Sequence, residues 1–242
     1  MFPRTLQVMA DYEQMSRHAA ELILAELKKT PDILLCASAG RTPTRTYELL
    51  VAAQSRRSRI FQRLRVLEID EWAGLGVDHP ASCEKYLKEK LLGLMKIGGR
   101  RCAGFRSDAP DADAECERIS AWLAKHGPID LCVLGLGENG HVALNEPGAS
   151  LSPDAHVVRL SRRSLEHPML AGMKRKPTRG LTLGMSQILQ SRRILLLVSG
   201  EHKRAVLKRL LKPQVSTWFP ASLLWLHGDV TIICDRDAAG RL

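Results

Sequence analysis

Residues 135–148, GLGENGHVALNEPG, combine a histidine, two glutamates and four glycines in one short segment. His141 is of the one side-chain type that ordinarily titrates near neutral pH. Glu146 can approach it if the intervening residues, VALN, form a single turn. A histidine oriented by a carboxylate suits general acid–base catalysis. Glycines let the backbone bend tightly and let a ligand come close, so this segment predicts a site more readily than a piece of core.

A second carboxylate that could take part in catalysis lies in EIDEW, residues 68–72, where a predicted strand ends. Adjacent residues on an extended segment face opposite ways, so Asp70 and Glu71 are not expected to serve the same centre. One carboxylate aimed into a cleft can take a proton from a carbon next to a carbonyl. The alternative interpretation is an ordinary surface acid.

Two further segments are suited to binding an anion. In SAGRTPTRTY, residues 38–47, a small glycine-containing turn precedes Thr42 and Pro43, which open a predicted helix. The free N–H groups of such a helix start suit a phosphate, although Thr42 is also a good ordinary N-cap. In SGEHKRA, residues 199–205, Lys203 falls in the first helical turn and opposes the helix dipole. A bound phosphate would resolve this mismatch, and a lysine pointing into water is the alternative.

The elements that must position these residues are predicted from hydrophobic patterning. Near-continuous apolar runs, which predict buried strands, lie at 32–38, 64–69, 129–137, 193–200 and 230–235. Helices are predicted before and between these runs, from helical spacing of apolar residues or from composition, at 10–29, 43–53, 82–92, 111–126 and 201–211. Strands buried on both faces and alternating with helices predict an α/β fold, a mainly parallel sheet sandwiched by helices in a Rossmann-like, three-layer arrangement.

The remaining features of the chain favour one domain. A further strand is predicted at 156–160, and neither an internal repeat nor a linker rich in Pro, Gly or Ser divides the 242 residues. We therefore predict a single domain over residues 1–242. In open parallel sheets, ligands bind outside the carboxyl ends of the strands, and all four chemical segments follow such ends. They are expected to meet around one phosphorylated small molecule, with Asp70, His141 and Glu146 moving protons.

Several function classes are disfavoured. The net charge is +10, but the basic residues are scattered and aromatic residues make up 5% of the chain, so nucleic-acid binding is not expected. The six cysteines lack zinc spacing. GLGENGH lacks the dinucleotide-binding spacing, and there is no GxSxG elbow. We therefore predict neither a metal nor a cofactor. No stretch approaches the roughly 18 apolar residues of a membrane span, which predicts a cytoplasmic protein without membrane contact.

Taken in order, the motifs resemble a known family. GRTPTRTY, DEWAGL with HPAS close behind, GLGENGHVALNEPG, SGEHK and FPASLLWLH are similar to segments of the glucosamine-6-phosphate deaminase/isomerase family, over residues 33–235. GHVALNEPG is the most specific of them. FRSDAPDADAECER, TRGLTLG and VSTWFPASLLWLH resemble its galactosamine-6-phosphate branch more closely.

The resemblance implies a reaction on an amino-sugar phosphate. The sugar ring is opened, the aldose is isomerised to a ketose, and the C2 nitrogen leaves as ammonia. Asp70 would be the base that moves a proton between C2 and C1, and His141 would assist ring opening with Glu146 as its carboxylate partner. The resemblance gives the phosphate to Gly40, Arg41, Thr42 and Lys203. It places the backbone of Gly135 and Gly137 along the sugar.

The chain departs from the glucosamine enzymes at two places. They commonly have an aspartate two residues before the histidine, where this chain has Asn139. We expect Asn139 to orient the imidazole by a hydrogen bond, and the histidine pKa to be lower than an aspartate would make it. The galactosamine branch also has asparagine here. An arginine of the glucosamine enzymes falls near Leu170, and Arg179 is expected to take over its phosphate or sugar contact.

We therefore predict conversion of galactosamine 6-phosphate and water to tagatose 6-phosphate and ammonia. Glucosamine-6-phosphate deamination to fructose 6-phosphate is the alternative. A 6-phosphogluconolactonase typically has GxDGHxASLFP, so the NEP after the histidine disfavours it. A sugar-phosphate sensor would need a DNA-binding helix-turn-helix, and residues 1–31 hold one predicted helix. The expected partner is a small-molecule sugar phosphate. The family's assemblies vary, so a homo-oligomer stays open.

Overall fold

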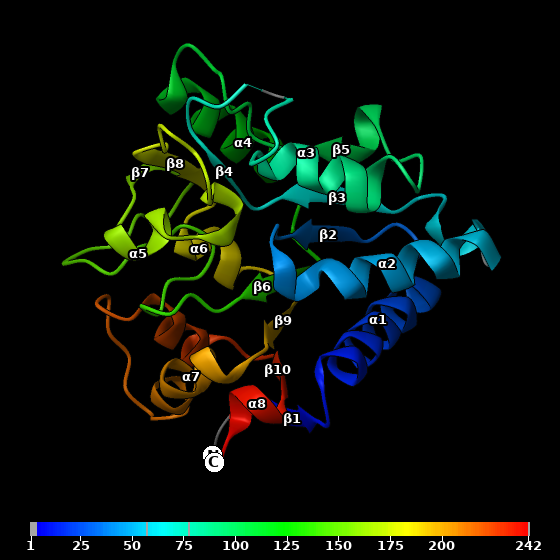
Figure 1. Ribbon diagram of the computed structural model, residues 1–242. Helices are drawn as coiled ribbons and strands as arrows, with labels where there is room; N and C mark the ends of the chain where they lie inside the picture. Colours follow the sequence, from blue (N-terminus) through cyan, green and yellow to red (C-terminus); the bar gives the residue numbers. More distant parts are fainter. Residues whose placement is uncertain (1–3, 57, 77, 242) are drawn as a thin grey trace.

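The computed structural model describes residues 4–56, 58–76 and 78–241 (Figure 1). Its centre is a seven-stranded sheet in the order β1-β10-β9-β6-β2-β3-β5, in which every neighbouring pair is parallel. The strands are β1 (Arg4–Met9), β2 (Leu34–Ala37), β3 (Arg65–Glu68), β5 (Cys102–Ala103), β6 (Leu131–Gly135), β9 (Arg193–Val198) and β10 (Val230–Asp235). The predicted parallel α/β sheet is confirmed.

Both faces of the sheet are covered. On one face, α1 (Tyr12–Lys29) and α2 (Arg41–Arg56) lie side by side and pack on strand residues such as Leu35 (Figure 1). On the other face, α4 (Ala112–His126), α6 (Met185–Leu189) and α7 (Arg204–Leu210) pack on residues such as Leu34. Successive strand residues point to opposite faces, so uninterrupted apolar runs supply both hydrophobic cores.

A small antiparallel sheet follows the carboxyl end of β3. It has the order β4-β8-β7 and contains β4 (Asp70–Trp72), β8 (Arg179–Thr182) and β7 (His156–Arg159). Trp72 packs in a separate hydrophobic cluster with Leu144, Leu160 and Leu170. The sequence predicted the strand at 156–160 but not this sheet. The small sheet matters for the site because pairing of β4 with β8 fixes the position of the Asp70 backbone.

The remaining elements are short. They are α3 (Cys83–Leu87), α5 (Arg162–Leu165), α8 (Arg236–Ala239), the π-helical η2 (Lys88–Leu92) and the 3-10 turns η1 (Ser58–Phe61), η3 (Gly99–Arg101), η4 (Pro168–Leu170), η5 (Glu201–Lys203) and η6 (Pro220–Leu226). The helix predicted at 43–53 begins earlier, at Arg41, so Thr42 lies inside its first turn rather than at the N-cap. Within the described ranges, none of the helices has the length and apolar character that crossing a bilayer requires.

Candidate active site

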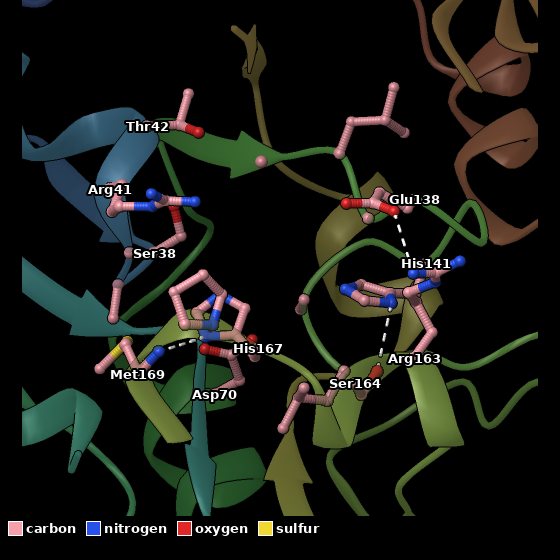
Figure 2. A pocket seen from close by; sticks show the side chains of 18 of the residues that line it. Ser38, Arg41, Thr42, Asp70, Glu138, His141, Arg163, Ser164, His167 and Met169 are labelled. Carbon is pink, nitrogen blue, oxygen red and sulfur yellow. Dashed lines mark hydrogen bonds and ion pairs between the residues drawn. The ribbon is translucent and has the colours of Figure 1, made fainter. Parts of the chain in front are cut away.

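A pocket of about 440 Å³ opens where the four chemical segments leave the sheet (Figure 2). The loop after β2 contributes Gly40, the start of α2 contributes Arg41 and Thr42, and β4 contributes Asp70. The end of β6 contributes Gly135, the loop after it contributes Gly137 and His141, and Lys203 comes from η5 after β9. The structure therefore brings residues that are far apart in the chain around one cavity at the carboxyl ends of the parallel strands.

Asp70 faces this pocket from the first position of β4. Its backbone lies opposite Thr182 of β8 in antiparallel register, which holds the residue in place. Desolvation, with a smaller contribution from the negative charge of Glu71, raises the pKa of Asp70 to about 7. A carboxyl that exchanges its proton near neutral pH can serve as a general base.

Glu71 points to the opposite side of β4 and is fully buried, as the alternation along an extended segment predicts. Its carboxylate accepts four hydrogen bonds of 2.7–3.0 Å, from the backbone N–H groups of Trp72, Cys83 and Glu84 and from the Ser82 hydroxyl. Three of these donors belong to the start of α3, whose N-cap is Ser82. Glu71 thus joins β4 to α3 and holds the strand that carries Asp70.

His141 and Glu146 form the predicted pair. Val142 and Asn145 close the turn between them, with Ala143 at φ 50°, and Glu146 Oε2 lies 3.8 Å from His141 Nδ1. Burial lowers the pKa of His141, opposed by the negative charge of Glu146 and assisted by the positive charge of Lys203. His141 is therefore neutral at neutral pH.

Glu146 is held as an anion. Burial would raise its pKa, but hydrogen bonds from the Ser164 hydroxyl, the Ser161 N–H and Asn139, together with His141, lower it below its ordinary value. With a carboxylate beside Nδ1, the favoured tautomer of the neutral ring carries its proton on Nδ1. Nε2 is then free to exchange protons with a ligand in the pocket.

Asn139 acts differently from its prediction. Its Oδ1 accepts the backbone N–H of His141 at 3.1 Å, and its Nδ2 donates to Glu146 Oε2 at 2.8 Å. Within the described residues, no hydrogen bond joins its side chain to the imidazole ring. The expectation that Asn139 orients the ring directly is therefore wrong, because the amide spans the turn and the carboxylate instead.

The glycines beside His141 have distinct roles. A Cβ on Gly137 would lie 2.4–2.5 Å from three ring atoms of His141, so only a glycine lets the imidazole lie here. Gly140 has φ +91°, and a Cβ there would meet the Phe219 ring at 2.0 Å. A Cβ on Gly135 would meet no protein atom within 4 Å. The first two shape the loop, whereas Gly135 leaves open space in the pocket wall.

The opposite end of the pocket is positively charged. Gly40, at φ +122°, turns the chain into α2, whose first residues are Arg41 and Thr42. Lys203 Nζ donates to the Leu136 carbonyl at 2.7 Å. Burial lowers the pKa of Lys203, and the charges of Arg41 and Arg163 lower it further, against the effect of Glu138. Converging cations beside a helix start suit an anionic group.

Arg179 does not join this site. It is exposed on β8 and lines a separate hollow with Arg106 and Asp111. The expectation that Arg179 contacts the sugar or the phosphate is therefore wrong. Arg163 lines the pocket in addition to Arg41, and its Nη1 lies 3.4 Å from Glu138 Oε2 (Figure 2). Arg163 is not among the residues predicted from the sequence, because the basic residues there are scattered.

Residues 163–169 complete the wall and were not predicted. His167 packs on Trp72 with ring centroids 5.7 Å apart, and Ser164 donates to Glu146. Burial lowers the pKa of His167 to about 4, with the charges of His141, Lys203 and Arg41 acting in the same direction. The one sequence feature that could have indicated this segment is His167 next to Pro168, in a stretch without the hydrophobic periodicity of a helix or a strand.

One group of potential metal ligands occurs among the described residues, behind Asp70. Glu68, Glu71 and Cys83 place one ligand atom each within 4.8 Å of the others, and all three are buried. Glu71 already satisfies its oxygens with four donors. The arrangement therefore fits a hydrogen-bonded structural carboxylate better than a metal centre.

A base poised near neutral pH, a histidine–glutamate pair and a cationic end define the class of an enzyme that moves protons on a small anionic substrate. The sequence matches the family model for glucosamine-6-phosphate isomerases/6-phosphogluconolactonase over residues 10–233. The chain belongs to this family of sugar-phosphate enzymes.

Its relatives include deaminases of high coverage. AgaI of Escherichia coli (strain K12), provisionally named a deaminase, is 40% identical over 93% of this chain and 90% of its own length. The glucosamine-6-phosphate deaminase of Geobacillus sp. (strain WCH70) is 37% identical over 95% and 92%. A solved monomeric glucosamine-6-phosphate deaminase superimposes with a TM-score of 0.91 and 34% identity, over 97% of this chain and 98% of that one. The protein is therefore an amino-sugar-phosphate deaminase/isomerase of this family.

Proposed function

We propose that the protein converts galactosamine 6-phosphate and water to tagatose 6-phosphate and ammonia. The observation that carries the proposal is that Asp70, His141 and Lys203, from three segments far apart in the chain, line one pocket of about 440 Å³. The preference for the galacto sugar rests on the sequence motifs that resemble the galactosamine-6-phosphate branch of the family, and on Asn139, which that branch also has.

The cationic end would hold the phosphate. Arg41 and Lys203 supply charge, and the first backbone N–H groups of α2, at Arg41 and Thr42, supply donors. The loop at Gly135 and Gly137 would border the sugar. The C1 end of the sugar would then extend from the start of α2 toward Asp70 and His141.

Ring opening would come first. His141 Nε2 takes the proton of the anomeric hydroxyl, and the resulting imidazolium is stabilised by Glu146, 3.8 Å from Nδ1. The imidazolium returns the proton to the ring oxygen as the bond from C1 to that oxygen breaks. A neutral histidine with an anionic partner is suited to this exchange.

Isomerisation would follow on the open chain. The Asp70 carboxylate takes the proton from C2 and delivers it to C1, while a proton of the nitrogen passes to the oxygen on C1. The aldehyde thereby becomes an alcohol and the amine becomes an imine at C2. Water adds to this imine, ammonia leaves, and the ketose remains. A base with a pKa of about 7 can both take and return the proton.

Glucosamine 6-phosphate is the second candidate substrate, because close relatives of high coverage are glucosamine-6-phosphate deaminases. The two sugars differ at C4 only. Both candidates use the same residues in the same roles.

The test is an assay of ammonia and ketose 6-phosphate with each hexosamine phosphate in turn, without added metal or nucleotide. We expect release from both sugars, with a higher kcat/KM for galactosamine 6-phosphate. A higher value for glucosamine 6-phosphate would contradict the galacto preference. No ammonia from either, or faster hydrolysis of 6-phosphogluconolactone, would overturn the deaminase proposal.

A further inference from the structure

His167 occupies a central place in the pocket wall that the steps above do not use. Its ring packs on Trp72, two residues beyond Asp70 on β4. A Cβ built on Gly40 would lie 3.9 Å from its Nε2, so this nitrogen faces the loop that starts α2. His141, Lys203 and Arg41 all act on it electrostatically. His167 therefore lies between the Asp70 side of the pocket and its cationic end (Figure 2).

The protonation of His167 is fixed by its own loop. Nδ1 accepts the backbone N–H of Met169 at 3.3 Å, so Nδ1 carries no proton (Figure 2). The backbone N–H of His167 donates to the Ser164 carbonyl, and its carbonyl accepts from Leu170. A neutral ring with Nδ1 as acceptor has its proton on Nε2. The pocket is thus presented with a preoriented, uncharged N–H donor.

The other positions of the sugar already have partners. In the proposed mechanism Asp70 acts at C1 and C2, His141 acts at the ring oxygen, and the cationic end binds the phosphate on C6. The hydroxyls at C3 and C4 remain. Because Nε2 faces Gly40 at the phosphate end, the hydroxyl nearer the phosphate, on C4, is the one within its reach.

We propose that His167 Nε2–H donates a hydrogen bond to the C4 hydroxyl of the sugar and thereby sets the preference between the galacto and gluco epimers. This inference rests on the proposed function. The two epimers direct the C4 hydroxyl differently, so one rigid donor satisfies one of them better. A neutral donor also adds no further positive charge to a pocket already crowded with cations.

The test combines an enzyme variant with a substrate analogue. His167→Phe keeps a ring against Trp72 and removes the N–H donor. We expect its kcat/KM on galactosamine 6-phosphate to fall about tenfold, the value of one neutral hydrogen bond, and the galacto-to-gluco ratio to fall with it. On 4-deoxygalactosamine 6-phosphate the same substitution should change kcat/KM by less than about twofold, because the partner is already absent. The 3-deoxy analogue should keep the full loss.

Two variants control for packing. His167→Gln retains an N–H donor and should restore part of the epimer ratio. His126→Phe is the matched control, since His126 also stacks on a tryptophan, Trp122, with centroids 4.7 Å apart, but lies outside the pocket. It should leave the ratio unchanged. Nitrogen-15 NMR of the histidine rings provides a reading independent of turnover, with the proton expected on Nε2 of His167.

The outcomes separate the two proposals. Wild-type turnover with an unchanged epimer ratio in His167→Phe would overturn the role of His167 alone. An equal loss on the 4-deoxy analogue, or a ring protonated on Nδ1, would do the same. Absence of ammonia from both hexosamine phosphates with the wild-type protein would overturn the proposed function itself.

Discussion

Asn139 donates from Nδ2 to Glu146 Oε2 at 2.8 Å while its Oδ1 accepts the backbone N–H of His141 at 3.1 Å. One amide thus spans the turn that separates the imidazole from its carboxylate. An amide can do both because it carries a donor and an acceptor, whereas a carboxylate is an acceptor only. This arrangement explains how an asparagine serves at a position where glucosamine enzymes commonly have an aspartate.

The substitution Asn139→Asp should therefore be harmful in this protein. It would keep the acceptor for His141 and place a second carboxylate against Glu146, where like charges disfavour ionisation of both. We expect kcat/KM to fall at least about tenfold at pH 8, since a hydrogen bond to a charged group is lost. Part of the activity should return near pH 6, where the pair can share a proton. Full activity of the variant at pH 8 would show that the amide donor is dispensable.

The activity of the wild-type protein should depend on the ionisation of Asp70. Its pKa is raised to about 7, and in the proposed reaction only the carboxylate form takes the C2 proton, so kcat/KM should rise with pH up to about 7 and then level. The lowered pKa of His141 places its own titration at a more acidic pH. Asp70→Asn should lose turnover at every pH and still bind the substrate. An acidic limb near pH 4 would mean that the pKa of the catalytic base is not raised by burial.

Most of the central sheet could be predicted because its strands are buried on both faces. β9, for example, is apolar at every residue after Arg193, so it is recognised without knowledge of its neighbours. β1 escaped prediction because it is an edge strand in which Val8 is 48% exposed, so its pattern is mixed. β4 and β8 are three and four residues long, and they form through pairing with each other and with β7, which the local sequence pattern does not record.

The same division applies to the site. Residues at glycine-rich strand ends, such as His141, could be found because parallel topology brings those ends together. Arg163 and His167 could not, since the path of their segment is set by packing of Leu170 against Trp72 and Leu160. Arg179 was misassigned because nearness in sequence to the expected position says nothing about which surface of β8 it occupies.

Lys203 should contribute to substrate binding more than to the chemical step. Lys203→Ala removes a cation from the end of the pocket proposed to hold the phosphate, so KM should rise at least about tenfold with a smaller change in kcat, because hydrogen bonds to charged groups are worth roughly 1.5–3 kcal/mol. Lys208→Ala, on the exposed surface of α7, is the control and should leave both constants unchanged. Equal KM values for the two variants would remove Lys203 from the phosphate site.

Gly137 should be required for the position of the imidazole rather than for folding. A Cβ there would lie 2.4–2.5 Å from three ring atoms of His141, so Gly137→Ala must displace the ring. Because small displacements of catalytic groups cost on the order of a hundredfold in rate, kcat should fall by about that factor while the melting temperature changes little. Gly98→Ala is the matched control, since a Cβ at Gly98 meets no atom within 4 Å. Wild-type kcat in Gly137→Ala would show that the ring position is not critical.

The last prediction concerns Glu68, which is 4% exposed, and whose carboxyl oxygens both lack a well-formed hydrogen bond within the described residues. Burial, together with the charges of Glu71 and Asp70, raises its pKa well above the ordinary value, and the Phe105 backbone offsets this only in part. In the folded protein Glu68 therefore keeps its proton at pH values where the unfolded chain has lost it.

This difference has a definite sign. Above the unfolded pKa of about 4.3, unfolding releases the Glu68 proton, so the free energy of unfolding falls as pH rises toward the folded pKa. Glu68→Gln cannot titrate and escapes that loss. The variant and the wild type should agree within about 1 kcal/mol at pH 4, and the variant should become the more stable protein by pH 8. Denaturant unfolding at several pH values measures this, with Glu117→Gln on the exposed face of α4 as the control. Parallel stability curves for Glu68→Gln and the wild type would mean that Glu68 titrates alike in the folded and unfolded chains.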